Sequence, residues 1–160
     1  MDRLRRELLA LLDFQQAHVD LDSALSDLPT EHRLKRGADL PHSVWEVLEH
    51  MRIAQLDILN YTVDPTWQSP HWPDEYWPDP AVKDTDAVWS TTLDGLRTDL
   101  ERARELARSG DNDLLTEIPH GHGGHTYLRE LLLIAQHNSY HIGQIVAIRQ
   151  ALGSWPPKSA

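Results

Sequence analysis

Apolar residues recur at helical spacing in four segments of the chain, and no segment shows the alternation typical of a β-strand. The predicted helices run from about Asp2 to Asp27, from Ser43 to about Tyr61, from Asp84–Asp86 to Gly110, and from about Thr126 to Leu152. Four amphipathic helices predict an all-α protein built as a four-helix bundle. At this length, residues 1–160 are expected to form a single domain.

Local signals mark the ends of these helices. Ser43 and Glu46 have the spacing of a capping box, in which each side chain binds a free backbone amide at a helix start. Pro29 is expected to end the first helix, and Gly153 lies just after the last one.

The second connection, from Val63 to Lys83, is rich in proline and aromatic residues. Loops longer than about 15 residues are unusual in a compact domain. We therefore predict a long crossover between helices two and three, which lets these helices run parallel. Trp67, Trp72 and Trp77 are expected to cover the apolar groove of the bundle, and roofing of a pocket is the alternative.

Composition narrows the classes of function. The chain carries 25 acidic and 15 basic side chains, a net charge of −10, and so is expected to repel nucleic acid. It has no cysteine, which excludes disulfides, thiolate metal ligands and a cysteine nucleophile. No apolar run approaches the length of a membrane span. A cytoplasmic protein without nucleic-acid or membrane partners is the expectation.

Histidines on the predicted helices are the main candidates for chemistry. His137 and His141 are four residues apart, so both imidazoles lie on one side of the fourth helix, on or beside its apolar stripe. His50 occupies an inward position on the second helix and is the candidate third ligand. Three neutral imidazoles suit a divalent cation and leave part of its coordination sphere open, as catalytic metals require.

Two familiar metal classes do not fit this pattern. Zinc peptidases place a glutamate directly after the first histidine of the pair, whereas this chain has Asn138. Di-iron bundles place a glutamate three residues before a histidine. The corresponding positions hold Val47, Ile134 and Asn138.

The remaining histidines are weaker candidates. His120, His122 and His125 lie among glycines and are expected to shape the start of the fourth helix, with a loop metal site as the alternative. His18 shares an apolar face and is expected to be a packed or edge residue, with a role beside the metal as the alternative. His42, in a loop, is expected to be solvated.

Two stretches carry a family resemblance: Ser43-Val-Trp-Glu-Val-Leu-Glu-His50, and Gly123-Gly-His-Thr-Tyr-Leu-Arg-Glu-Leu-Leu132 with the following His137-Asn-Ser-Tyr-His141-Ile-Gly-Gln144-Ile. Through them the chain resembles the DinB/YfiT-like superfamily over nearly its whole length. The resemblance implies an up-down-down-up bundle, a divalent metal held by His50, His137 and His141, and frequent homodimers. It also implies relatives that are metal-dependent transferases using thiols such as bacillithiol or mycothiol, or thiol-dependent isomerases.

The first functional hypothesis is a metal-dependent enzyme acting on a small molecule, either a transferase that uses a low-molecular-weight thiol or a hydrolase. A metal can hold a deprotonated sulfur or an activated water, and the sequence does not choose between them. Zinc or nickel is the expected metal. Gln144, three residues after His141, is expected to orient a ligand or bound water, with a surface amide as the alternative. The competing hypotheses are a non-catalytic stress-response module that binds a metal or small ligand, and a structural dimerising bundle.

Overall fold

The structure, a computed structural model, describes residues 2–79, 81–83 and 85–158. Over these residues the chain forms two short 3-10 segments, Thr30–His32 and Asp74–Tyr76, and five α-helices: α1 (Arg3–Leu12), α2 (Leu21–Leu25), α3 (Val44–Val63), α4 (Asp86–Arg108) and α5 (Tyr127–Ala151). The described residues include no strand, so the all-α prediction is confirmed. Asp84, part of the predicted start of the third helix, lies outside the described residues.

The predicted capping signals are present at the helix ends. Ser43 Oγ accepts a hydrogen bond from the Glu46 amide at 3.3 Å, and Glu46 Oε2 accepts one from the Ser43 amide at 2.7 Å, which completes the capping box of α3. Thr126 caps α5 in a similar way through the Arg129 amide. Gly153, with a φ of 69°, follows the end of α5 in the left-handed region that glycine adopts without strain.

The prediction of one continuous first helix is wrong, because the chain leaves helical geometry between α1 and α2. Phe14 has a φ of 57°, which no α-helix accommodates, and its ring is buried with only 5% exposed. Asp20 then starts the short α2 by accepting a hydrogen bond from the Ser23 amide at 2.7 Å. Apolar spacing continues through the break, so periodicity alone could not reveal it.

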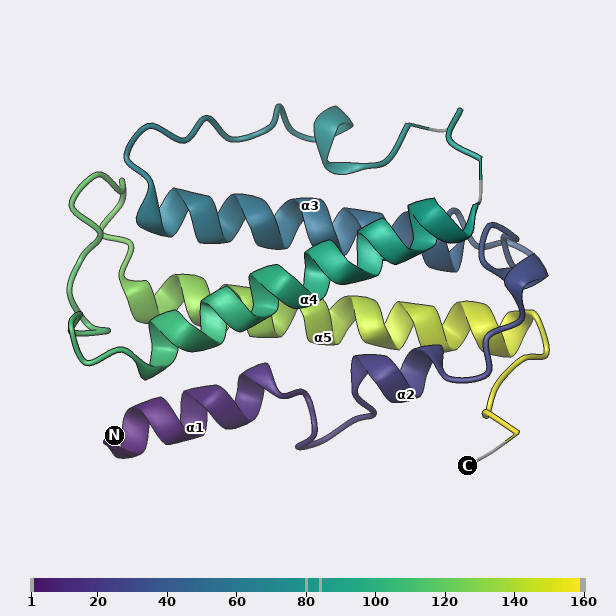
Figure 1. Cartoon of the computed structure of the whole chain (residues 1–160), viewed down its shortest axis with the longest axis horizontal. Helices are drawn as coiled ribbons and strands as arrows, with labels where there is room; N and C mark the ends of the chain where they lie inside the picture. Colours follow the sequence, from purple (N-terminus) through teal and green to yellow (C-terminus); the bar gives the residue numbers. More distant parts are fainter. Residues whose placement is uncertain (1, 80, 84, 159–160) are drawn as a thin grey trace.

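The core lies where the three long helices meet. In Figure 1, α3, α4 and α5 lie side by side, and α1 and α2 follow one another along one edge of the group. Large apolar side chains on all three long helices are almost fully buried: Leu48, Met51, Leu59, Leu96, Ile134, Ile142 and Ile145. Each such side chain stabilises the fold by about 1.5–3 kcal/mol relative to its exposed state.

The described residues of the proline-rich segment, 64–79, 81–83 and 85, cross back along α3, as Figure 1 shows, so that α4 begins near the start of α3. We call this segment the strap. It packs against α3 through the 3-10 segment Asp74–Tyr76. The strap therefore covers one side of the helix that carries His50.

A buried arginine fastens the end of the chain to α2. The Arg149 side chain is fully buried and donates to the carbonyls of Ala24 at 2.6 Å and Ser154 at 2.6 Å. One partner is local and the other lies on α2, so the guanidinium connects the end of α5 to α2. Among the described helices, none combines the length and the apolar character that a membrane span needs.

Candidate metal centre

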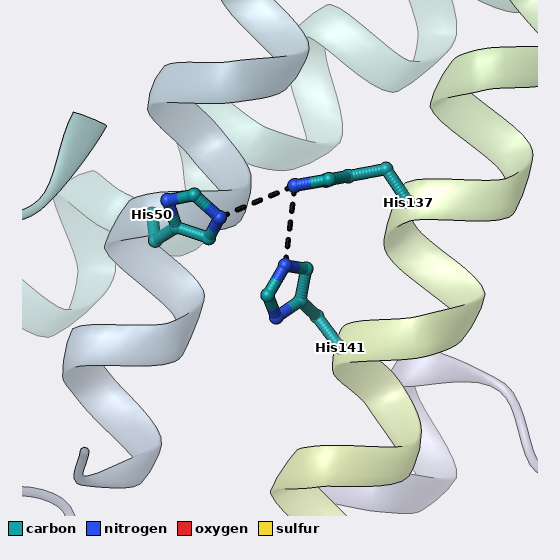
Figure 2. A group of neighbouring side chains, drawn as sticks. All are labelled: His50, His137 and His141. Carbon is teal, nitrogen blue, oxygen red and sulfur yellow. Dashed lines mark hydrogen bonds between the residues drawn. The ribbon is translucent and has the colours of Figure 1, made fainter. Parts of the chain in front are cut away.

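Three imidazole rings from two helices meet at one point between α3 and α5. His137 Nε2 lies 3.2 Å from His50 Nε2 and 3.1 Å from His141 Nε2, and Figure 2 shows the three rings pointing toward one another. All three ligand nitrogen atoms lie within 4.8 Å of one another. The predicted trio therefore lies close enough together to hold a metal ion. It is the one such group of histidine, aspartate or glutamate among the residues that the structure describes.

Outer hydrogen bonds orient two of these rings. His50 Nδ1 lies 2.8 Å from the carbonyl oxygen of Tyr76, and His141 Nδ1 lies 2.7 Å from Gln144 Oε1. Both oxygen atoms are acceptors, so each Nδ1 carries the proton and each Nε2 presents a lone pair to the centre. An outer acceptor of this kind holds a metal-binding imidazole in the required tautomer and orientation.

The donor set fits a divalent cation. His137 Nε2 has at most one proton to share between the lone pairs of His50 and His141, so the three nitrogen atoms have more acceptors than donors. Two imidazole nitrogens bound tetrahedrally at zinc–nitrogen distances of 2.0–2.1 Å lie about 3.3 Å apart. The observed separations are close to this value, and a cation would satisfy all three lone pairs.

The protein interior keeps these rings neutral. Burial lowers the pKa of His137 to about 4, and the neighbouring His50 ring contributes to the shift. Burial, followed by the effect of His137, lowers the pKa of His141 to about 4. Burial also lowers the pKa of His50, although its hydrogen bond to Tyr76 acts in the opposite direction. The rings are thus uncharged at neutral pH, the form that binds metals.

We expect the metal-free protein to lose stability as the pH falls from about 6.5 toward 4. In this interval the unfolded chain, with ordinary imidazole pKa values near 6.5, binds more protons than the folded protein, so the free energy of unfolding decreases on acidification. Urea unfolding followed by circular dichroism in the presence of a chelator measures this trend. A His141→Gln variant, which lacks one of the buried rings, should show a shallower dependence. A pH-independent midpoint across the interval would contradict the expectation.

The strap packs against the histidine cluster and forms one of its walls. Its Trp77 indole stacks on the His50 ring, with centroids 4.1 Å apart and planes inclined by 8°, and on the His42 ring at 3.8 Å and 11°. His42 is half-buried, so its predicted solvation is wrong. The prediction that the tryptophans mainly cover the bundle is also wrong for Trp77 and Trp72, because both line a cavity beside the three histidines.

Asp57 fastens the strap to α3. Its Oδ1 accepts a hydrogen bond from Trp67 Nε1 at 2.8 Å, and its Oδ2 accepts one from the Tyr76 hydroxyl at 2.5 Å. Burial and the bond to Asp57 raise the pKa of Tyr76 above its ordinary value, so the phenol stays protonated as a donor. Since Tyr76 also supplies the carbonyl that contacts His50, this buried carboxylate connects the strap to the three-histidine cluster.

A cavity of about 610 Å³ opens next to the histidines and provides room for a small molecule. Its walls come from α3, α5, the strap and the segment before α3. Besides the three histidines, it is lined by Pro41, His42, Ala54, Asp57, Ile58, Trp72, Tyr76, Trp77, Leu133, Tyr140 and Gln144.

The other histidines lie away from this centre. His18 is exposed, and its ring nitrogens lie 2.8 Å from the Val19 carbonyl and 3.0 Å from Ser139 Oγ. The histidines of the loop before α5 gather around Tyr61: His120 Nε2 contacts its carbonyl oxygen, and His125 Nδ1 contacts its hydroxyl. They do not belong to the group that could hold a metal.

Sequence reasoning missed two polar groups beside the site. Asp57 follows His50 by seven residues, two helical turns, so helical spacing could have found it. The second is a buried amide pair in which Asn138 Nδ2 donates to Gln55 Oε1 at 2.6 Å and ties α5 to α3. Asn138 occupies the position where zinc peptidases carry a glutamate, and here it serves as a link between helices.

Comparison with known proteins adds one finding. A family model described as the DinB superfamily matches residues 2–145, most of the chain, including all three histidines of the cluster. Neither the curated proteins nor the solved structures yielded a significant match.

Proposed function

Because this chain belongs to the DinB superfamily, we propose that it is a metal-dependent enzyme in which His50, His137 and His141 hold a divalent cation, with zinc or nickel as the metal. The observation that carries the proposal is the convergence of three neutral imidazoles beside a cavity. Three protein ligands leave at least one coordination position for an exchangeable molecule, which is the arrangement of catalytic zinc sites.

We further propose that a low-molecular-weight thiol occupies the open position and that its sulfur forms a bond to the electrophilic carbon of a small substrate. The thiol proton then passes to the departing group or, in an addition, to the substrate itself. When bound, the cation supplies Lewis acidity that keeps a thiol deprotonated near neutral pH. The chain itself has no cysteine, so a reacting thiol has to come from a cofactor or substrate.

The residues of the chain divide the remaining tasks. The Tyr76 carbonyl and Gln144 hold the rings of His50 and His141 in the ligating tautomer. Trp77 and Trp72 line the cavity on the strap side, where we assign them the task of limiting access of water to the reacting atoms. Gln144 lines the cavity as well, so we assign it the second task of orienting a bound ligand.

The family assignment also supports a proposal for the order of the helices. We propose that α1 and α2 together act as one broken helix of a four-helix bundle with up-down-down-up order, formed by residues 1–160 as one domain. The strap supports this order because it returns along α3 before α4 begins (Figure 1).

The test begins with tag-free protein reconstituted with zinc, nickel or cobalt. We expect about one equivalent of metal per chain, and turnover that depends on the metal when a panel of thiols is offered with small electrophiles. Less than about 0.2 equivalents bound would contradict the metal site and favour a structural bundle. Full metal binding without turnover of any thiol–electrophile pair would contradict the enzyme and favour a non-catalytic binding module.

A further inference from the structure

We propose that the cavity beside the three histidines selects small molecules whose body, beyond the atom that reaches the metal, is uncharged or positively charged, and that it rejects anionic ones. The inference rests on the proposed function, since it names the class of ligand that the same site takes. It comes from the charges and surfaces of the cavity walls.

The walls carry one carboxylate and, among the residues that the structure describes, no lysine or arginine. Asp57 is 9% exposed, and its two oxygen atoms accept hydrogen bonds from neutral groups, the indole of Trp67 and the phenol of Tyr76. These partners stabilise the carboxylate without cancelling its charge. A negative potential therefore extends into the cavity from its α3 wall.

When the site holds its cation and a thiolate, no net positive charge remains to attract an anionic ligand. A dication, one thiolate and the carboxylate of Asp57 sum to zero, and the three imidazoles are neutral ligands. An anionic body entering this cavity would lose its hydration without gaining a cationic partner, which is strongly unfavourable.

The other walls suit an apolar or cationic body. Aromatic faces attract cations through the negative potential above the ring and also stack on planar groups. Four aromatic side chains besides the histidines line the cavity, three from the strap and one from α5: Trp72, Tyr76, Trp77 and Tyr140. The faces of Trp77 are covered by His42 and His50, so a ligand meets only its edge, and the other three supply the aromatic faces. Ile58 and Leu133 add aliphatic surface.

The nearby arginines are engaged on other surfaces. Arg52 pairs with Glu49 at 2.6 Å and lines a separate cavity of about 650 Å³, which Trp77 also lines. Arg36 forms an ion pair with Glu46 at the start of α3. Neither side chain lines the cavity beside the histidines.

The test uses cobalt-loaded protein and three thiols: phenylmethanethiol and its para-aminomethyl and para-carboxylate derivatives. The ring keeps each charged group away from the sulfur, so the charge cannot reach the metal. Binding is followed through the sulfur-to-cobalt charge-transfer band at about pH 8, where free imidazole is neutral. We expect the amine and the neutral thiol to bind at least about tenfold more tightly than the carboxylate.

Three variants test which residues cause the preference between the charged thiols. Asp57→Asn should reduce the ratio of the affinity for the amine to the affinity for the carboxylate by about tenfold. Tyr140→Lys, a change at a position that is 64% exposed at the cavity wall, should strengthen binding of the carboxylate. Asp79→Asn removes the same charge from the wall of the other cavity and should leave the preference unchanged.

The outcomes separate the inference from the function on which it rests. Equal affinities for the three thiols, or a preference for the carboxylate in the unmodified protein, would overturn the charge selection while leaving the metal site intact. Absence of the charge-transfer band with every thiol would contradict the open coordination position, and the inference would be lost with it.

Discussion

Replacing His137 with alanine is expected to lower the affinity of the protein for zinc by more than about a hundredfold, because losing a ligand costs more than losing the outer partner of a ligand. His137 is the central ring of the cluster, since its Nε2 atom is the one that contacts both His50 and His141. Without it, the two remaining nitrogens come from different helices and do not enclose a cation. Competition with a chromophoric chelator measures the affinity, and metal-dependent turnover should disappear with it.

The matched control is His122→Ala. This histidine is exposed in the loop before α5, and its ring packs against Tyr61, away from the cluster. The control variant should bind zinc as tightly as the unmodified protein. If His137→Ala retained that affinity, or if both variants lost it equally, the assignment of the three histidines as the metal ligands would be wrong.

The pairing of His137 with His141 could be predicted from helical geometry, whereas their meeting with His50 depends on the packing of α3 against α5, which the family resemblance implied. The four-residue spacing of His137 and His141 places both rings on one side of α5, and the capping box at Ser43 sets where α3 begins. The same signals predicted the end of α5 at Gly153. Such features are local, so the sequence contains what determines them.

The surroundings of the site could not be predicted, because they depend on contacts between segments distant in sequence. The strap has no hydrophobic period that would reveal its path, so the stacking of Trp77 between His42 and His50 was invisible. The break after α1 was hidden for a different reason, since Phe14 remains apolar and buried while its backbone leaves the helical region. Tertiary burial decided the conformation there, against the local pattern.

Replacing Asp57 with alanine is expected to release the strap and to weaken zinc binding by about 10- to 100-fold, the usual cost of losing an outer partner of a metal ligand. The carboxylate accepts hydrogen bonds from Trp67 and Tyr76, and its removal leaves two half-buried donors without an acceptor, at about 1–3 kcal/mol each. The Tyr76 carbonyl would then no longer be held against His50 Nδ1. Zinc affinity and limited proteolysis within residues 64–85 measure the two effects.

Asp57→Asn separates this anchoring role from the charge of the carboxylate. The amide oxygen accepts one of the two hydrogen bonds, and the amide nitrogen can donate to the Tyr76 oxygen, so the strap should stay in place and zinc affinity should change little. The alanine variant alone should be cut faster in the strap. Since His50 reaches the strap through Tyr76, unchanged zinc affinity in a proteolytically sensitive alanine variant would show that the metal centre does not depend on the strap.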